Sequence, residues 1–169
     1  MFRGSARAKL DEKGRLKLPA AYLEPLTAKF GTKLFITSMN GAAARIYPLE
    51  KWLEIEARMA AHDGLFNPDL ERFQQTVNYW GREAELDGQG RVVIHSPLRE
   101  QAGIEGDCVV MGDPSGFLTV LSQVNAEQQI AAQPLTRKER VRVARLLSGE
   151  TRAGSPAKAP EANDGEADT

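Results

Sequence analysis

The chain has 169 residues, enough for one ordinary domain or two small fused ones. Its composition, 41% hydrophobic and 27% charged, is typical of a globular protein, and we expect neither a signal peptide nor a membrane-spanning helix because no long apolar run occurs. The net charge of -1 conceals an uneven distribution, since residues 1–45 carry nine Lys and Arg against three Asp and Glu, whereas residues 46–87 carry four against nine. We therefore expect a cytoplasmic protein with a basic N-terminal part suited to a polyanion.

Residues 5–10 and 15–19 form the first pair of predicted strands. Small or apolar side chains alternate with polar ones in both runs, as in a strand with one buried face. The segment DEKGR between them is typical of a type I turn with a glycine bulge, in which Asp11 accepts backbone N–H groups and Gly14 takes the left-handed conformation. The two runs are therefore predicted to form a hairpin with one cationic outward face. Its cations are Arg7, Lys9, Lys13, Arg15 and Lys17.

A short helix and two further strands complete this unit. The helix is predicted to stop near Pro25, because proline interrupts helical hydrogen bonding. Strands are expected at 33–38 and 43–48, and residues 82–124 repeat the whole order of strand, strand, helix, strand, strand. The second turn, DGQGR, has the same spacing of Asp87, Gly90 and Arg91. Two copies of one module predict a pseudo-twofold domain.

The segments between and after the two units have the spacing of apolar residues that is typical of helices. Apolar side chains recur at helical spacing in residues 48–61 and 67–80, and we expect these helices to cover the open side of the sheet, the alternative being a groove for a partner. Thr136 and Glu139 form a capping-box pattern at the start of a basic helix that ends at Gly149. This helix is either a solvated segment on a tether or an additional contact for DNA or an acidic neighbour.

Together these features predict five segments along the chain. The predicted boundaries are 5–50 for the first repeat, 51–81 for the inter-repeat helices, 82–125 for the second repeat, 126–149 for a C-terminal helical segment and 150–169 for a disordered tail. The tail is rich in Ala, Pro, Gly and acidic residues. Cys108, the single cysteine, is expected to be a small strand residue.

The repeated motifs resemble those of the MraZ family of bacterial transcriptional regulators, whose repeats belong to the SpoVT/AbrB swapped-hairpin class. The matching segments are MFRG at the start, LDEKGRLKLP in the first repeat, YPLEKW at its end, and LDGQGRVVI with LREQAGI in the second. The resemblance covers roughly residues 1–124. It implies an α+β, mainly β, pseudo-twofold swapped-hairpin AbrB-like barrel of two ββαββ repeats, with helices between the repeats and a C-terminal helix.

The same resemblance implies a function. It points to a sequence-specific DNA-binding transcriptional regulator of the cell-division and cell-wall gene cluster, which binds short repeats in double-stranded promoter DNA as a ring-like homo-oligomer at the nucleoid. No enzymatic activity, cofactor, metal, membrane or small-molecule substrate is expected, since the two histidines lack metal-ligand spacing and no nucleophile motif occurs. The alternative is an antitoxin-type interaction module that binds a partner protein, with residues 136–169 as the candidate segment.

The Asp-x-x-x-Arg pattern is implied by the resemblance to matter for DNA binding. We assign DNA contacts to the five cations of the first hairpin, with Arg15 as the positioned contact and the lysines as phosphate contacts. Turn ordering is assigned to Asp11, Gly14, Asp87, Gly90 and Arg91. Because the outward positions of the second hairpin are acidic to neutral, we predict that the first hairpin leads DNA binding. Leu23 departs from the family pattern, which often has arginine there, and His95 stands where proline is common.

Overall fold

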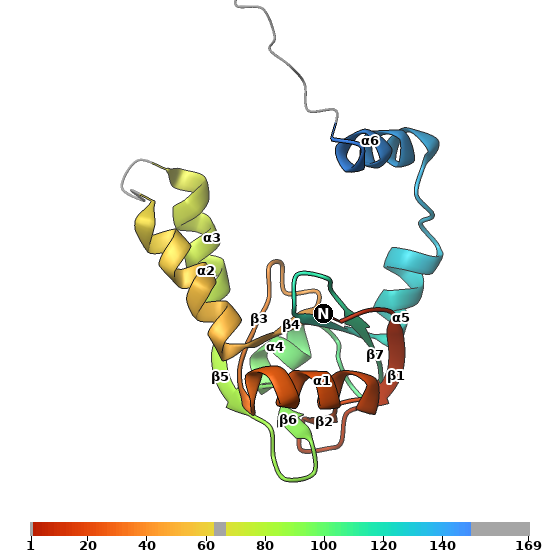
Figure 1. Cartoon of the computed structure of the whole chain (residues 1–169). Helices are drawn as coiled ribbons and strands as arrows, with labels where there is room; N and C mark the ends of the chain where they lie inside the picture. Colours follow the sequence, from red (N-terminus) through yellow and green to blue (C-terminus); the bar gives the residue numbers. More distant parts are fainter. Residues whose placement is uncertain (1, 63–66, 150–169) are drawn as a thin grey trace, which may run out of the picture. The chain divides into compact units, whose positions relative to one another are not determined.

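The computed structural model describes residues 2–62 and 67–149 (Figure 1). The chain divides into two compact units, Met1–Gln133 and Pro134–Thr169. The predicted disordered tail, 150–169, lies outside the described residues. Within the described ranges, every helix is too short or too polar to cross a membrane.

The first unit contains two copies of one ββαββ module. The first copy comprises β1 (Ser5–Lys9), β2 (Arg15–Lys17), α1 (Ala20–Phe30), β3 (Lys33–Thr37) and β4 (Ala44–Pro48). The second comprises β5 (Arg82–Glu85), β6 (Arg91–Val93), α4 (Ser96–Gln101), β7 (Asp107–Gly112) and β8 (Leu118–Ser122). The connecting and trailing elements are α2 (Leu49–Ala61), α3 (Pro68–Tyr79), α5 (Gln123–Ala126) and a π-helical turn, η2 (Glu127–Ala131). The repeated order of sequence patterns thus corresponds to a repeated order of elements.

Each repeat exchanges its first strand with the other repeat. Six antiparallel strands form one sheet in the order β1-β7-β8-β4-β3-β5, and β2 pairs with β6 in a separate two-stranded ribbon. When each strand is replaced by its counterpart in the other repeat, the same strand order is obtained, read from the opposite edge of the sheet. A pseudo-twofold axis requires this symmetry. The predicted α+β, mainly β, swapped-hairpin fold of two repeats is confirmed, although the pairings of the described strands leave an open sheet and do not close a barrel.

The predicted pairing of residues 5–10 with residues 15–19 is wrong beyond the turn. One isolated bridge joins Leu10 to Leu16. Beyond it, β1 runs into the six-stranded sheet and β2 into the ribbon. Alternation predicts which side chains point inward, but it does not identify the partner strand. The five cations of this segment are consequently divided between two sheets.

Helix α1 continues past Pro25, where the sequence predicts its end. The buried side chains of the helix are Tyr22 and Leu26. Proline removes one hydrogen bond to the carbonyl of Ala21, and both residues are exposed, so water can satisfy that carbonyl. The helix ends at Gly31, whose N–H donates to the carbonyl of Thr27 at 3.1 Å. Burial of the apolar face therefore outweighs one missing backbone bond.

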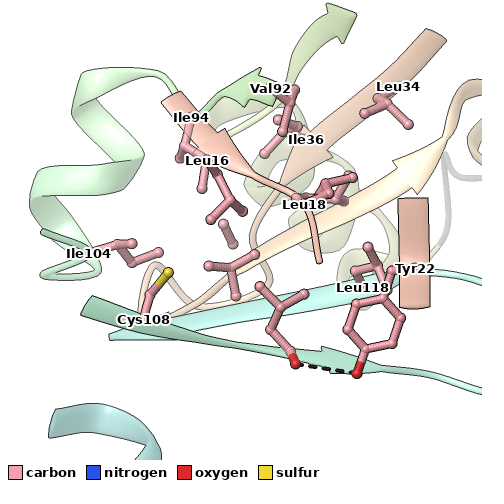
Figure 2. Close-up of a cluster of buried hydrophobic side chains, with 14 of the residues drawn as sticks. Leu16, Leu18, Tyr22, Leu34, Ile36, Val92, Ile94, Ile104, Cys108 and Leu118 are labelled. Atoms are coloured by element: carbon pink, nitrogen blue, oxygen red, sulfur yellow. Dashed lines mark hydrogen bonds between the residues drawn. The ribbon is translucent and has the colours of Figure 1, made fainter. Parts of the chain in front are cut away.

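The main core lies between the ribbon and the large sheet and draws on both repeats. Figure 2 shows Leu16 and Val92 of the ribbon in one cluster with Ile36, Cys108 and Leu118 of the sheet, all at most 1% exposed. Burial raises the pKa of the Cys108 thiol to about 11, so this strand cysteine stays protonated at neutral pH. Because the inner face of the ribbon is anchored in the core, its other face is directed outward.

Helices α2 and α3 form an arm that packs on the sheet only at its base (Figure 1). Trp52 stacks on Phe35 with ring centroids 4.4 Å apart and lies 5.2 Å from the ring of Tyr47. Trp52 is the only buried side chain of α2, and Val77 is the only one of α3. The predicted helices therefore cover only part of the sheet, and their remaining turns extend away from it.

The second unit contains α6 (Arg137–Leu147) within its described part. Its predicted capping box is confirmed, because the Thr136 hydroxyl accepts from the N–H of Glu139 and the Glu139 carboxylate accepts from the N–H of Thr136. None of its described side chains is buried. The helix is thus stabilised locally and exposes its basic side chains.

Candidate nucleic-acid interface

The first Asp–Arg turn is held together by one carboxylate. Asp11 Oδ1 accepts from the backbone N–H groups of Lys13 and Arg15, both at 2.9 Å, and Arg15 Nε donates to Asp11 Oδ2 at 2.6 Å. Gly14, with φ of 74°, donates its N–H to the carbonyl of Asp11 at 2.9 Å. A left-handed residue at this point is what a type I turn with a glycine bulge needs.

The second turn repeats this construction bond for bond. Asp87 Oδ1 accepts from the N–H groups of Gln89 and Arg91, both at 2.9 Å, and Arg91 Nε donates to Asp87 Oδ2 at 2.8 Å. Gly90 has φ of 69° and donates to the carbonyl of Asp87 at 2.9 Å. The repetition in the sequence is therefore a repetition of geometry.

Both aspartates are held in the charged form. The hydrogen bond from the backbone N–H of Arg15 is the main cause that lowers the pKa of Asp11. The equivalent bond from Arg91 is the largest cause at Asp87, and with the bonds from the Arg91 side chain and the N–H of Gln89 it lowers the pKa of Asp87 from 3.8 to about 2. Each arginine makes this ion pair through Nε, so the ion pair leaves the donors on the two Nη nitrogens of the guanidinium group unused.

Each turn is also bonded to the residue that directly follows a ribbon strand of the other repeat. The carbonyl of Gly14 accepts from the N–H of Ile94 at 2.9 Å, and the carbonyl of Gly90 accepts from the N–H of Leu18 at 3.0 Å. Neither turn is the tip of an independent hairpin. The two turns flank one shared ribbon (Figure 1).

Side chains from both repeats share the outer face of this ribbon. In the antiparallel register Arg15 lies opposite Val93 and Lys17 lies opposite Arg91, while Leu16 and Val92 between them point into the core. We call these four outward residues, Arg15, Lys17, Arg91 and Val93, the ribbon face. Three of its four side chains are cationic.

The expected separate, acidic to neutral face of the second hairpin is wrong. Glu83 and Glu85 belong to β5, which pairs with β3 in the six-stranded sheet. Only β6 of that repeat reaches the ribbon, where it meets β2. Strand exchange therefore removes the acidic residues from Arg91 and brings Lys17 beside it.

Each turn is covered by a helix of the other repeat. The guanidinium of Arg99 in α4 lies directly against Gly14, and the side chain of Leu23 in α1 lies against Gly90. Arg99 and Leu23 occupy equivalent positions in the two repeats. The first turn thus has a cation that the second turn lacks. Sequence reasoning noted Leu23 but missed Arg99, because only strand exchange shows which turn each helix covers.

The remaining predicted cations lie around the first turn and on the adjoining strand. Arg7 and Lys9 are exposed on β1, where they lie opposite Val109 and Asp107 of β7. Lys9 lines the same pocket as Asp11 and Arg99, so it belongs to the surroundings of the first turn. Lys13 is exposed within the turn itself. The cations brought together on the ribbon face are therefore Arg15, Lys17 and Arg91, with Lys9, Lys13 and Arg99 beside its first turn.

The chemistry of this surface is that of hydrogen-bond donors and positive charge. Arginine and lysine donors on a narrow exposed ribbon suit phosphate oxygens and the acceptor edges of bases. Among residues 2–62 and 67–149, no cluster of three or more His, Cys, Asp or Glu side chains could hold a metal ion.

Comparisons with known proteins agree with the two-repeat architecture. A family model described as "MraZ protein, putative antitoxin-like" matches residues 1–76 and 81–142. The chain is 40% identical over 139 residues to the transcriptional regulator MraZ of Acidobacterium capsulatum, an alignment that covers 82% of this chain and 94% of the relative. It is 43% identical over 143 residues to that of Koribacter versatilis, with the same coverage, and 36% identical over 117 residues to that of Nitrosomonas eutropha, covering 69% and 78%. The role named for these relatives is regulatory and not enzymatic. On these matches, over both of its repeats, the chain belongs to the MraZ family.

Proposed function

We propose that this chain is a sequence-specific DNA-binding transcriptional regulator and that the ribbon face contacts the DNA. The observation that supports this best is the register of β2 and β6, in which the half-buried Arg15 and Arg91 and the exposed Lys17, from two repeats, share one outward face. A two-stranded ribbon fits the major groove of B-DNA, where an arginine can bond guanine bidentately. The regulatory role named for the MraZ relatives supports the same assignment.

The residues of this surface divide into two kinds of contact. Arg15 and Arg91 make the positioned contacts, because each guanidinium is fixed through Nε by its aspartate and keeps its Nη donors for the ligand. Lys17 and Lys13 bind phosphates, as do Lys9 and Arg7 on the adjoining β1. Lys17 Nζ donates to the carbonyl of Gln89, a neutral acceptor that a phosphate oxygen would replace.

Assembly of several copies into an oligomer would allow such a small surface to bind DNA tightly. One ribbon offers few phosphate contacts and therefore a modest, salt-dependent affinity. When several copies in a ring-like homo-oligomer meet short repeated sites, each later contact is effectively intramolecular and avidity rises. We infer that the sites lie in the promoter of the cell-division and cell-wall gene cluster, and that the protein is nucleoid-associated. Membership of the MraZ family supports this target.

Binding to the DNA upstream of the chain's own gene tests the proposal. Fluorescence anisotropy should detect tight, salt-sensitive binding to that fragment and weaker binding to a shuffled fragment of equal composition. Arg15→Ala should weaken specific binding by about fivefold or more, about 1–3 kcal/mol. Arg72→Ala, which removes an exposed arginine of α3, is the matched control, and light scattering keeps the oligomeric state comparable. Equal affinities of the two variants would contradict the proposal.

An antitoxin-type role is the second candidate, favoured by the words "antitoxin-like" in the description of the family model. Its natural contact is α6, whose Val141, Val143 and Leu147 are exposed. Purification from the native cell extract distinguishes the two roles. A stoichiometric second protein that is lost on deletion of residues 134–169 would favour the antitoxin role, whereas co-purification of promoter DNA alone favours the regulator.

A further inference from the structure

We propose that Val93 reads the 5-methyl group of thymine in the major groove, within about two base pairs of the one contacted by Arg15. The inference rests on the proposed function and adds a chemical class of base to it. Val93 is the one apolar member of the ribbon face and is 51% exposed. Its place is not explained by the core, because the neighbouring Val92 supplies the buried contact of β6 and is 1% exposed.

The repeat provides an internal comparison at this position. Lys17 occupies the equivalent place on β2 and is, like Val93, exposed. A lysine at this place can bind a phosphate, whereas a valine side chain makes no favourable contact with one. The thymine methyl is the apolar group that a base pair presents in the major groove, and small apolar side chains are its usual contacts. A valine exposed among cations therefore suits a base edge and not the DNA backbone.

The register sets where such a contact would fall. Directly opposed side chains in an antiparallel pair have Cβ atoms about 4.5–5.5 Å apart. Successive base pairs are about 3.4 Å apart along one strand. An Arg15 guanidinium bound to guanine would therefore bring Val93 to a base within about two pairs of that guanine. At the other end of the ribbon, the residue directly opposite Arg91 is Lys17, and Val93 lies two residues further along β6, opposite Arg15.

This difference gives the ribbon a direction on DNA. The two turns are equivalent in their hydrogen bonds, so by themselves they would bind in either orientation. The Arg15 and Val93 end combines a guanine donor with a methyl contact, whereas the Arg91 and Lys17 end is wholly cationic. A site with thymine close to guanine on one side only would consequently be bound in one orientation.

A cycle of protein and DNA changes tests the role of Val93. The probe is the DNA fragment upstream of the gene, prepared once with thymine and once with uracil, which lacks only the methyl group. The proteins are the full-length wild type, Val93→Ala, Val124→Ala and Arg15→Ala. Val124 is the matched control, an exposed valine of α5 outside the ribbon, at 59% exposure. Both valines are on the surface, so thermal melting should be unchanged in both variants.

We expect wild type and Val124→Ala to bind uracil DNA at least about fourfold more weakly than thymine DNA, since about fourfold is the effect of losing one buried methyl group at one bound ribbon. Val93→Ala should bind thymine DNA with a similar loss and should be indifferent to uracil. A Val93→Ala variant that keeps the full uracil penalty, or a wild type without one, would overturn the inference. Arg15→Ala distinguishes failure of the proposed function from failure of the role of Val93. DNA binding that does not depend on Arg15 would overturn the proposed function. Binding that depends on Arg15 but shows no preference for thymine would overturn only the role of Val93.

Discussion

Lys17 and Arg91 come from different repeats and lie directly opposite one another across the β2–β6 ribbon. Lys17 Nζ also donates to the carbonyl of Gln89 in the second turn. The first repeat therefore supplies a cation to the turn of the second. The charge around each turn is a property of the exchanged pair of repeats, and substitutions in either repeat should affect one shared surface.

Arg91→Ala should weaken DNA binding measurably, although less than Arg15→Ala. Both arginines belong to the ribbon face, but Lys9, Lys13 and Arg99 surround only the first turn. Anisotropy titrations of both variants against the upstream fragment, at matched oligomeric state, measure the two losses. An Arg91→Ala variant with wild-type affinity would restore the strict division between hairpins that the sequence favours.

Lys17→Ala should lower affinity about equally for specific and shuffled DNA. A lysine that contacts phosphate carries no base preference, and its removal should reduce the slope of log affinity against log salt by about 1. Titrations at four or more salt concentrations provide the slope. A change confined to the specific fragment would instead identify Lys17 as a base contact.

The second turn should loosen in acid, below the usual range for a carboxylate. The pKa of Asp87 is about 2 in the folded chain against an ordinary 3.8, so the ionised carboxylate favours folding at all pH values above about 4. This contribution falls as pH drops from about 4 and is lost below about 2. Backbone amide shifts of Gln89 and Arg91 in an NMR titration report the midpoint. Asp87→Asn should remove the transition, and a midpoint near 3.8 in the wild type would contradict the hydrogen-bonded turn.

Gly14→Ala and Gly90→Ala should each destabilise the fold, by about 1–2 kcal/mol from backbone strain alone, because both glycines have positive φ. The loss should be larger for Gly90→Ala. A Cβ at Gly14 meets the far end of the long Arg99 side chain, which can rotate away, and the carbonyl of Ile94 at 3.1 Å. A Cβ at Gly90 meets Leu23, and this side chain packs against the core and has less freedom to move. Urea denaturation measures the difference. Gly88→Ala in the second turn is the control, since nothing lies within 4 Å of its added Cβ, and it should be nearly neutral.

Trp52→Ala should detach the base of the helical arm. The side chain is 1% exposed, stacks on Phe35, and donates from Nε1 to Glu56 at 2.7 Å. Truncating a buried tryptophan costs about 3–5 kcal/mol. Leu53→Ala, at a side chain 53% exposed in the same helix, should cost less than about 1 kcal/mol. Comparable losses for both in urea denaturation would contradict the packing of α2.

Much of the fold could be predicted because the decisive interactions are local. The aspartate of each turn bonds groups at most four residues away, and the glycine needs only its own φ. The capping box of Thr136 and Glu139 likewise spans three residues. Such contacts form wherever the same short sequence pattern occurs, so the repeat and its turns can be predicted from the sequence. The end of α1 was missed because a tertiary gain, burial of Leu26, overrode the local effect of Pro25.

The sequence by itself determined the two modules, their turns and which side chains point inward. The tertiary structure alone decided the partners: β1 with β7, β5 with β3, and β2 with β6. The physical reason is that a strand with alternating apolar and polar side chains can pair with any antiparallel strand that has an apolar inner face. Which strand it pairs with depends on how the side chains of both repeats fill one core. That choice brought Lys17 to Arg91, Val93 to Arg15 and Arg99 to Gly14.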